Sequence, residues 1–235
     1  MKPVVVFRHA LCEGAGYLGT FLEQHDIPWC EVRIDLGETL PASASAYSGL
    51  VFMGGPMSVN DDLPWISETL ALIREAVALD IPVLGHCLGG QLMSKALGAE
   101  ITANHTKEIG WGEVFVGDNA QAKNWFGNIE RFVSFHWHGE TFDLPQAAQH
   151  LLSSQYCQNQ AWSMGKHFAM QCHIEMTEDM VQAWCNVGQQ EIQASLTSPG
   201  VQSADTIVLN AANFVADLNQ QAKVVYTQWI KGLRF

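Results

Sequence analysis

Short apolar runs alternate with amphipathic stretches along the first hundred residues. The apolar runs at 3–8, 29–34, 49–53 and 81–85 predict buried strands. Apolar positions at helical spacing predict helices over 17–25, 67–79 and 89–97. We expect Ser67 to cap the second helix and Gly98 to follow the end of the third. This alternation predicts an α/β fold, in which helices cover both faces of an open, mostly parallel, flavodoxin-like sheet.

The pattern changes after residue 99. Short strands with loops between them are expected at 99–103, 112–116, 132–135, 150–154, 161–162 and 167–172. Residues 178–185 predict a helix with Thr177 as its N-cap. After a break at 198–200, residues 205–231 predict one long amphipathic helix that packs on the domain surface. We therefore expect one domain over 1–188 and a C-terminal helical extension over 189–235.

Composition narrows the class of protein. The chain has 235 residues, 48% of them hydrophobic and 15% charged, which is typical of a compact globular domain. Its net charge of −12 argues against nucleic acid or an anionic membrane surface as the main partner. Six scattered cysteines, no targeting segment and no apolar run of membrane-spanning length favour a reducing cytoplasmic location.

The predicted strand at 81–85 leads into Gly85-His86-Cys87-Leu88-Gly89, and a helix follows at once. This is the layout of a nucleophile elbow with cysteine in place of serine. The partial positive charge at the helix N-terminus would stabilise a Cys87 thiolate. The sequence around Cys87 alone is equally compatible with a small buried cysteine behind a glycine-rich turn.

A cysteine nucleophile needs a base, and the base needs a group that orients it. His173 and Glu175 lie two residues apart near the end of a predicted strand, so they fall on the same side of the chain. Gly54-Gly55-Pro56 ends another strand and could offer the Gly55 N–H as an oxyanion donor beside the N–H of Leu88. A solvated His/Glu pair and an ordinary turn are the alternatives.

Two further histidines, His136 and His138, are spaced i, i+2 after a predicted strand. Such a pair could bind a metal ion, but no third ligand lies nearby in the sequence, so we expect no metal site. We interpret His138-Gly139-Glu140 as part of a loop on the substrate side of the site.

Taken in order, Gly54-Gly55-Pro56, the residues around Cys87, His138-Gly139-Glu140 and Gln171-Cys172-His173-Ile174-Glu175 resemble the class I (triad) glutamine amidotransferase family. The similarity covers about residues 3–188, and the nearest resemblance is to stand-alone proteins similar to the glutaminase domain of GMP synthetase. The resemblance implies a catalytic triad of Cys87, His173 and Glu175. It further implies that Gly55 and Leu88 form the oxyanion hole, and that Gln91 and the His138-Gly139-Glu140 segment bind substrate.

Three positions depart from the family pattern. The family often has histidine at the position of Gly90 and proline at that of Ile174, and its GMP synthetase-like members tend to have serine at that of Trp137. None of these changes removes a catalytic atom. The Trp137 departure bears on substrate specificity.

The resemblance implies that the chain hydrolyses the γ-carboxamide of glutamine through a cysteine thioester, without metal or organic cofactor. A γ-glutamyl peptidase or hydrolase with the same triad, or a binding module without turnover, are the alternatives. The chain has no phosphate-binding loop of its own, so either a separate synthetase subunit takes the ammonia or water is the acceptor.

Overall fold

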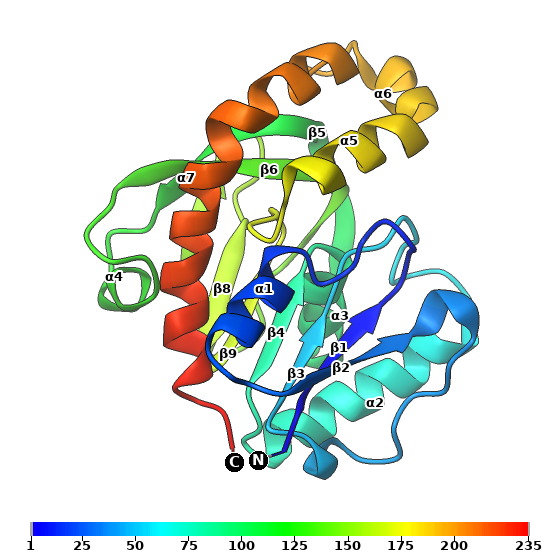
Figure 1. Ribbon diagram of the computed structural model, residues 1–235, viewed down its shortest axis with the longest axis vertical. Helices are drawn as coiled ribbons and strands as arrows, with labels where there is room; N and C mark the ends of the chain where they lie inside the picture. The colour runs from blue at the N-terminus through cyan, green and yellow to red at the C-terminus, as the bar shows by residue number, and fades with distance from the viewer. Residues whose placement is uncertain (1, 235) are drawn as a thin grey trace.

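In the computed structural model, residues 2–234 are described, and they contain a ten-stranded mixed sheet (Figure 1). One half of the sheet is parallel, in the order β2 (Trp29–Arg33), β1 (Val4–Arg8), β3 (Gly49–Phe52), β4 (Val83–His86) and β9 (His167–Met170). This is the flavodoxin-like order. The predicted strands of the first hundred residues are confirmed to within two residues.

The other half is mainly antiparallel. It continues through β8 (Ala161–Met164), β7 (Gln149–Ser154) and β5 (Ile101–Val116), which pairs with both β6 (Arg131–Phe142) and the short β10 (Gly200–Val201). The short strands predicted at 150–154, 161–162 and 167–172 are confirmed as β7, β8 and β9, whereas those predicted at 99–103, 112–116 and 132–135 belong to two longer strands. β5 and β6 are long, and the polar residues 104–107, where the pairing register shifts, had the appearance of a loop.

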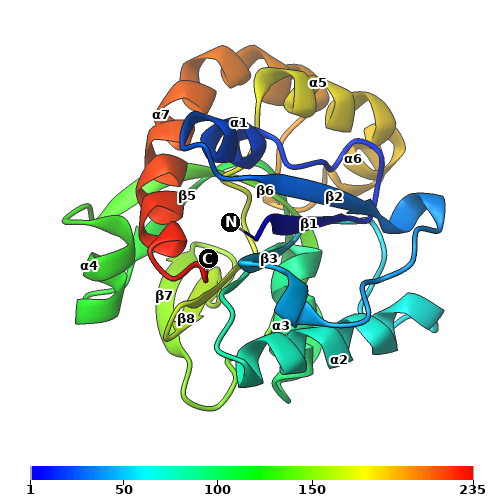
Figure 2. The same ribbon diagram turned by 60° about the horizontal axis from the view of Figure 1, so that its bottom comes forward.

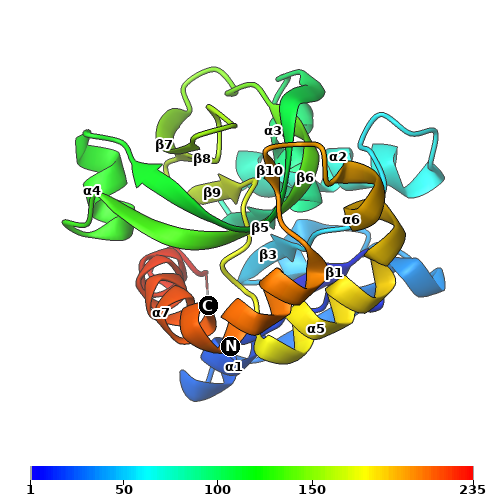
Figure 3. The same ribbon diagram turned by 90° about the horizontal axis from the view of Figure 1, so that it is seen from above.

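Helices cover both faces of the sheet (Figure 2). On one face lie α2 (Pro64–Ala78) and α3 (Leu88–Ala96). On the other lie α1 (Tyr17–Gln24), α5 (Glu178–Val187) and α7 (Ala204–Ile230), and α5 and α7 run side by side (Figure 3). Two 3₁₀ turns (Ile34–Leu36 and Ala44–Ala46) and the short helices α4 (Ala120–Phe126) and α6 (Gln189–Ser195) complete the elements.

Side-chain alternation along the strands builds a separate core on each face. In β1, Val4 and Val6 point to the core under α1 and α7, whereas Val5 and Phe7 point to the core under α2 and α3. The long helix α7 forms as predicted, and its Trp229 is fully buried in the same core as Val4.

The predicted helix ends have mixed outcomes. Thr177 caps α5, since its hydroxyl accepts a hydrogen bond from the Met180 N–H, as expected. Gly98 follows α3 with a φ of 89°, also as expected. Ser67 is not an N-cap, because α2 begins three residues earlier at Pro64, whose fixed φ suits the first helical position. The sequence pattern did not predict α4, whose N-cap is Asn119.

Among residues 2–234, no helix is both long enough and apolar enough to span a membrane.

Candidate active site

Cys87 lies between the end of β4 and the start of α3, with φ 49° and ψ −108°. A residue with a β-carbon rarely adopts a positive φ, so the turn holds Cys87 in a strained conformation. The Cys87 N–H donates to the Met170 carbonyl at 2.8 Å, and this bond ties the turn to β9. The predicted elbow geometry is therefore present.

The glycines around this turn allow the helix to approach the sheet closely. A β-carbon on Gly89 would overlap the backbone of Phe52. One on Gly90 would lie 2.6 Å from the Met170 carbonyl oxygen. The family histidine therefore has no room at position 90 of this chain, because the helix start lies directly on β9.

His173 and Glu175 are both buried, and His173 Nδ1 donates to Glu175 Oε1 at 2.6 Å. Burial alone would lower the pKa of His173, but the negative charge of Glu175 and the hydrogen bond to it favour the charged ring, and the pKa is raised well above its ordinary value. Burial would likewise raise the pKa of Glu175, but the charges of His173 and His86 lower it to about 2. The pair is thus an imidazolium and a carboxylate.

The backbone and one aromatic ring fix the position of the His173 ring. The His173 N–H donates to the Phe135 carbonyl at 2.8 Å, in an isolated bridge to β6. Trp184 meets the imidazole edge to face, with ring centroids 4.8 Å apart. These contacts hold His173 although Ile174 replaces the family proline. Among the described residues, His173 Nε2 has no hydrogen-bond partner, and both His173 and Cys87 line one cavity.

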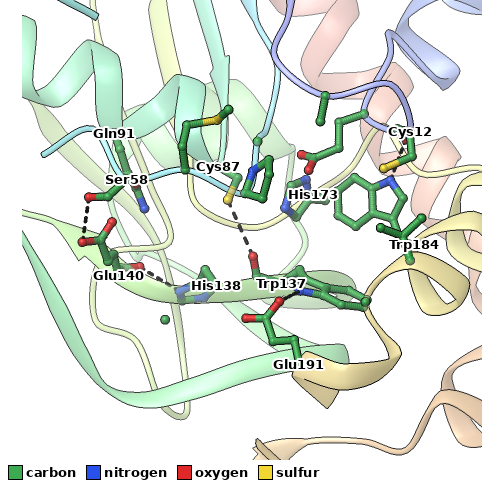
Figure 4. Close-up of a pocket in the computed structure, with 18 of the residues that line it drawn as sticks. Cys12, Ser58, Cys87, Gln91, Trp137, His138, Glu140, His173, Trp184 and Glu191 are labelled. Carbon is green, nitrogen blue, oxygen red and sulfur yellow. Dashed lines mark hydrogen bonds between the residues drawn. The ribbon is translucent and has the colours of Figure 1, made fainter. Parts of the chain in front are cut away.

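The cavity has a volume of about 570 Å³ (Figure 4). The Cys87 sulfur lies 3.7 Å from the Trp137 carbonyl oxygen and accepts a hydrogen bond from Gln171 Nε2 at 3.3 Å. The side chain of Gln171 also accepts a bond from Gln91 Nε2 at 3.1 Å. Gln91, predicted to bind substrate, is thereby linked to the sulfur through Gln171.

The two predicted oxyanion donors are neighbours. Leu88 is the first residue of α3, where backbone N–H groups lack partners within the helix. A β-carbon on Gly55 would lie 2.7 Å from Leu88 Cδ2, so a side chain at position 55 would crowd this side of the site. Gly55 also lines the cavity. The two residues therefore lie side by side, and their role as oxyanion donors stays a prediction.

The segment His138-Gly139-Glu140 lines the cavity but lies within strand β6 and is not a loop, so the loop interpretation was wrong. His138 and Glu140 pair with β5 on either side of the register shift, which falls at Gly139. Glu140 accepts a hydrogen bond from the Ser58 hydroxyl at 3.0 Å, which links the strand to the turn after β3.

A third candidate metal ligand, Glu108, lies beside His136 and His138, although no third ligand was near them in sequence. β5 supplies it, and His138 Nε2 lies 3.1 Å from Glu108 Oε2. The amide nitrogen of Gln160 lies among the three groups, 2.9 Å from Glu108 Oε2 and 3.3 Å from His136 Nδ1. These residues could hold a metal ion, although Glu108 already accepts hydrogen bonds from Ser154 and Gln160.

Sequence reasoning missed several residues of the site. Gln171 belongs to the stretch at 171–175 that resembles the family, but no role was predicted for it. Trp184 has the sequence pattern of an ordinary core residue of a helix. Glu13 follows β1 in a polar loop and lines the cavity. A β-carbon on Gly54 would overlap the Glu13 carboxylate and lie 3.2 Å from His173 Cε1. Burial raises the pKa of Glu13 to about 7. The one available signal was the position of Glu13 after a strand end, where ligands bind in open parallel sheets.

Comparison with known proteins agrees with this geometry. The family described as Glutamine amidotransferase class-I matches residues 7–181. The glutamine amidotransferase-like protein YfeJ of Salmonella typhimurium is 30% identical over 193 residues, 78% of this chain and 80% of that protein. Gamma-glutamyl peptidase 3 of Arabidopsis thaliana is 27% identical over 143 residues, 57% of each chain.

Among solved structures, a glutamine amidotransferase from Methylobacillus flagellatus superposes with a TM-score of 0.97 at 44% identity, over 100% of this chain and 96% of the other. The elbow, the sheet order and these matches agree, and they confirm the predicted fold class. The chain belongs to the class I glutamine amidotransferase family.

Proposed function

We propose that the protein hydrolyses a γ-glutamyl amide bond, with glutamine as the simplest substrate, through a thioester at Cys87. The observation that carries the proposal is the joint position of Cys87 and His173 on one cavity, with His173 bonded to Glu175 at 2.6 Å. A strained cysteine at a helix start, beside an imidazolium held by a carboxylate, suits nucleophilic attack on a carbonyl.

In the first half of the reaction, the Cys87 sulfur forms a bond to the γ-carbonyl carbon. The N–H groups of Gly55 and Leu88 stabilise the negative charge that develops on the oxygen. The bond between carbon and nitrogen then breaks, and His173 gives its proton to the departing amine. In the second half, His173 takes a proton from water, the hydroxide attacks the thioester, and glutamate leaves as the bond to sulfur breaks.

A second candidate function uses the same residues on γ-glutamyl peptides. The likeness to a relative named as a γ-glutamyl peptidase supports this alternative. The size of the cavity also supports it, because about 570 Å³ is within the range that holds a drug-sized ligand, and glutamine is much smaller. The two functions differ only in the group attached to the γ-carbonyl nitrogen.

If glutamine is the physiological substrate, the ammonia goes either to a separate synthetase chain or to solvent. Membership of the class I glutamine amidotransferase family is consistent with either route. A synthetase partner is identified if the rate of glutamine hydrolysis rises when the two chains form a complex.

The test combines covalent labelling with a substrate panel. We expect a glutamine-like electrophile, such as a diazoketone analogue of glutamine, to add one equivalent to the intact protein. Cys87→Ala abolishes the mass shift, whereas Cys12→Ala, which alters another thiol of the cavity, retains it. Labelling that persists in Cys87→Ala would refute the assignment of the nucleophile.

The panel consists of glutamine and γ-glutamyl dipeptides with uncharged side chains, with the released ammonia or amino acid as the readout. Hydrolysis of glutamine supports the first function, and cleavage of the dipeptides alone supports the second. A labelled, folded protein that hydrolyses none of them, with or without candidate synthetases, would contradict both.

A further inference from the structure

The cavity extends on both sides of the Cys87 sulfur (Figure 4). On one side lie Ser58, Gln91, His138 and Glu140, which include the residues predicted to hold the glutamyl part of the substrate. On the other side lie His173, Trp184 and Cys12. Because His173 protonates the departing amine, this other side faces the leaving group. We call it the second lobe, lined by Cys12, Glu13, Trp137, Trp184, Val187 and Glu191.

Two indole rings form the apolar wall of the second lobe. The ring centroids of Trp137 and Trp184 are 6.0 Å apart, and the rings are nearly perpendicular. Trp137 packs directly against Gly188, where a β-carbon would overlap the indole ring, and its Nε1 donates to Glu191 at 2.9 Å. The tryptophan that departs from the family pattern therefore forms a wall of the lobe. Ammonia has no apolar surface, so such walls fit a larger leaving group.

Apart from His138 and His173, the ionisable side chains that line the cavity on its glutamyl and leaving-group sides are acidic or cysteine. Glu13, Glu140 and Glu191 line it, and no lysine or arginine does among the residues that the structure describes. Ser58 donates to Glu140 and Lys107 pairs with Glu191 at 2.6 Å, so these two carboxylates have partners. Glu13 has no side-chain hydrogen bond and no ion pair within residues 2–234, although it lies beside Gly54 and His173. A half-buried carboxylate without a hydrogen-bond partner is stabilised by a bound cation.

We propose that the second lobe binds a leaving group that carries a positive charge, so that the preferred substrate is the γ-glutamyl amide of an aliphatic diamine, with Glu13 as a specificity-determining residue. This inference rests on the proposed function. The methylene chain packs against Trp137 and Trp184, and the distal ammonium pairs with the Glu13 carboxylate and faces the indole rings. Anionic leaving groups, such as the carboxylate-bearing part of a γ-glutamyl peptide, are disfavoured by the same charges.

The chemistry at the scissile bond is unchanged. The sulfur bonds to the γ-carbonyl carbon, and the bond from carbon to the proximal nitrogen breaks. That nitrogen takes the proton of His173 and leaves as the free diamine. Water then hydrolyses the thioester, returning its proton to His173. Glu13 touches only the distal ammonium.

The preference depends on pH with a definite sign. Burial is the largest influence on the Glu13 carboxyl and raises its pKa. Among its charged neighbours, His173 lowers the pKa, whereas Glu175 and Glu191 raise it, and the resulting pKa is about 7. Below this pH the carboxyl is neutral, and above it the carboxylate attracts the ammonium. The preference for the charged substrate therefore grows from about pH 6 to about pH 8.

The test compares two substrates of nearly equal shape. The mono-γ-glutamyl amide of diaminobutane carries a distal ammonium, and γ-glutamylpentylamide carries a methyl group in its place. We expect kcat/KM to be roughly tenfold higher for the first at pH 8, the effect of one charged contact. Glu13→Gln brings the ratio close to one, whereas Glu23→Gln, an exposed glutamate on α1, leaves it unchanged.

The outcomes separate this inference from the function on which it rests. The second-lobe inference alone is overturned if the wild-type enzyme hydrolyses glutamine or the pentylamide but its kcat/KM for the diaminobutane amide is no higher than for the pentylamide. A kcat/KM ratio that does not change with pH overturns it as well. A wild-type ratio that is high but unaffected in a folded Glu13→Gln variant, as judged by Cys87 labelling, overturns the role of Glu13. Failure of every substrate together with loss of Cys87 labelling overturns the proposed function as well.

Discussion

At the scale of single residues, the site depends on charges buried at short range. Glu175 is held against His173 at 2.6 Å, and its other oxygen lies 3.7 Å from His86 Nε2. Burial lowers the pKa of His86 although the Glu175 carboxylate opposes this shift, and the shorter contact of Glu175 is the one to His173. The carboxylate therefore does two things: it orients the imidazole and raises the pKa of His173.

The variant Glu175→Gln tests this role. It removes the negative charge but keeps the shape, so we expect kcat for γ-glutamyl amide hydrolysis to fall by roughly 10²–10⁴-fold. Because His173 loses the charge that raises its pKa, the alkaline limb of the pH–rate profile moves to lower pH. Steady-state kinetics across pH measure both effects.

Glu178→Gln is the matched control, since Glu178 is exposed on the first turn of α5 and touches none of the triad. Its kcat and pH profile remain those of the wild type. A Glu175→Gln enzyme with wild-type kcat would show that the carboxylate has no part in catalysis.

At the scale of elements, the active site is the junction of β4 with α3. The helix can start so close to the sheet only because positions 85, 89 and 90 lack side chains. This close approach lets the Cys87 N–H reach Met170 on β9, the strand that leads to His173. The elbow thus ties the proposed nucleophile to the strand that precedes its proposed base.

Gly90→Ala tests the close approach. Its new methyl group would lie 2.6 Å from a backbone oxygen, so we expect the free energy of unfolding to fall by about 1–3 kcal/mol. Urea denaturation measures the change. Labelling of Cys87 should slow in the same variant, because the turn must shift.

Gly14→Ala is the comparison, since the nearest atom to its β-carbon lies 3.9 Å away and its φ is not positive. We expect a change below about 1 kcal/mol there. Equal destabilisation by the two alanines would mean that backbone entropy, and not the packing of α3 on β9, explains the glycine at position 90.

At the scale of the whole molecule, the C-terminal helix completes the main core. α7 packs against α1, α4 and α5, and its Tyr226 hydroxyl lies 3.1 Å from His86 Nε2. The last helix therefore contacts a neighbour of the triad as well as the hydrophobic core. We propose that residues 189–235 unfold together with residues 1–188.

Trp229→Ala tests this at the level of stability. Trp229 is fully buried, so we expect its truncation to lower the free energy of unfolding by about 3–5 kcal/mol. Val224→Ala, at a residue of α7 that is 42% exposed, should change it by less than about 1 kcal/mol. We expect tryptophan fluorescence and the protection of Cys87 from labelling to change at the same denaturant concentration. Two separate transitions would show that the extension unfolds independently.

Much of the fold and part of the site could be predicted from the sequence, because those features are local. The parallel strands are continuous apolar runs, and α1, α3, α5 and α7 have apolar residues at helical spacing. The Gly-x-Cys-x-Gly turn is contained in five residues. His173 and Glu175 are two residues apart, so a short stretch of chain is enough to bring them to the same side.

Only the tertiary structure decided the remaining features, because they join distant parts of the chain. The lengths of β5 and β6 depend on their pairing with each other, which overrides the polar stretch at 104–107. Glu108 reaches His138 across that pair, and Glu13 reaches His173 from the first loop of the chain. The sequence by itself was enough to predict the chemistry that we propose at the Cys87 sulfur. The shape and charge of the cavity around it, which select the leaving group, come from side chains that only folding brings together.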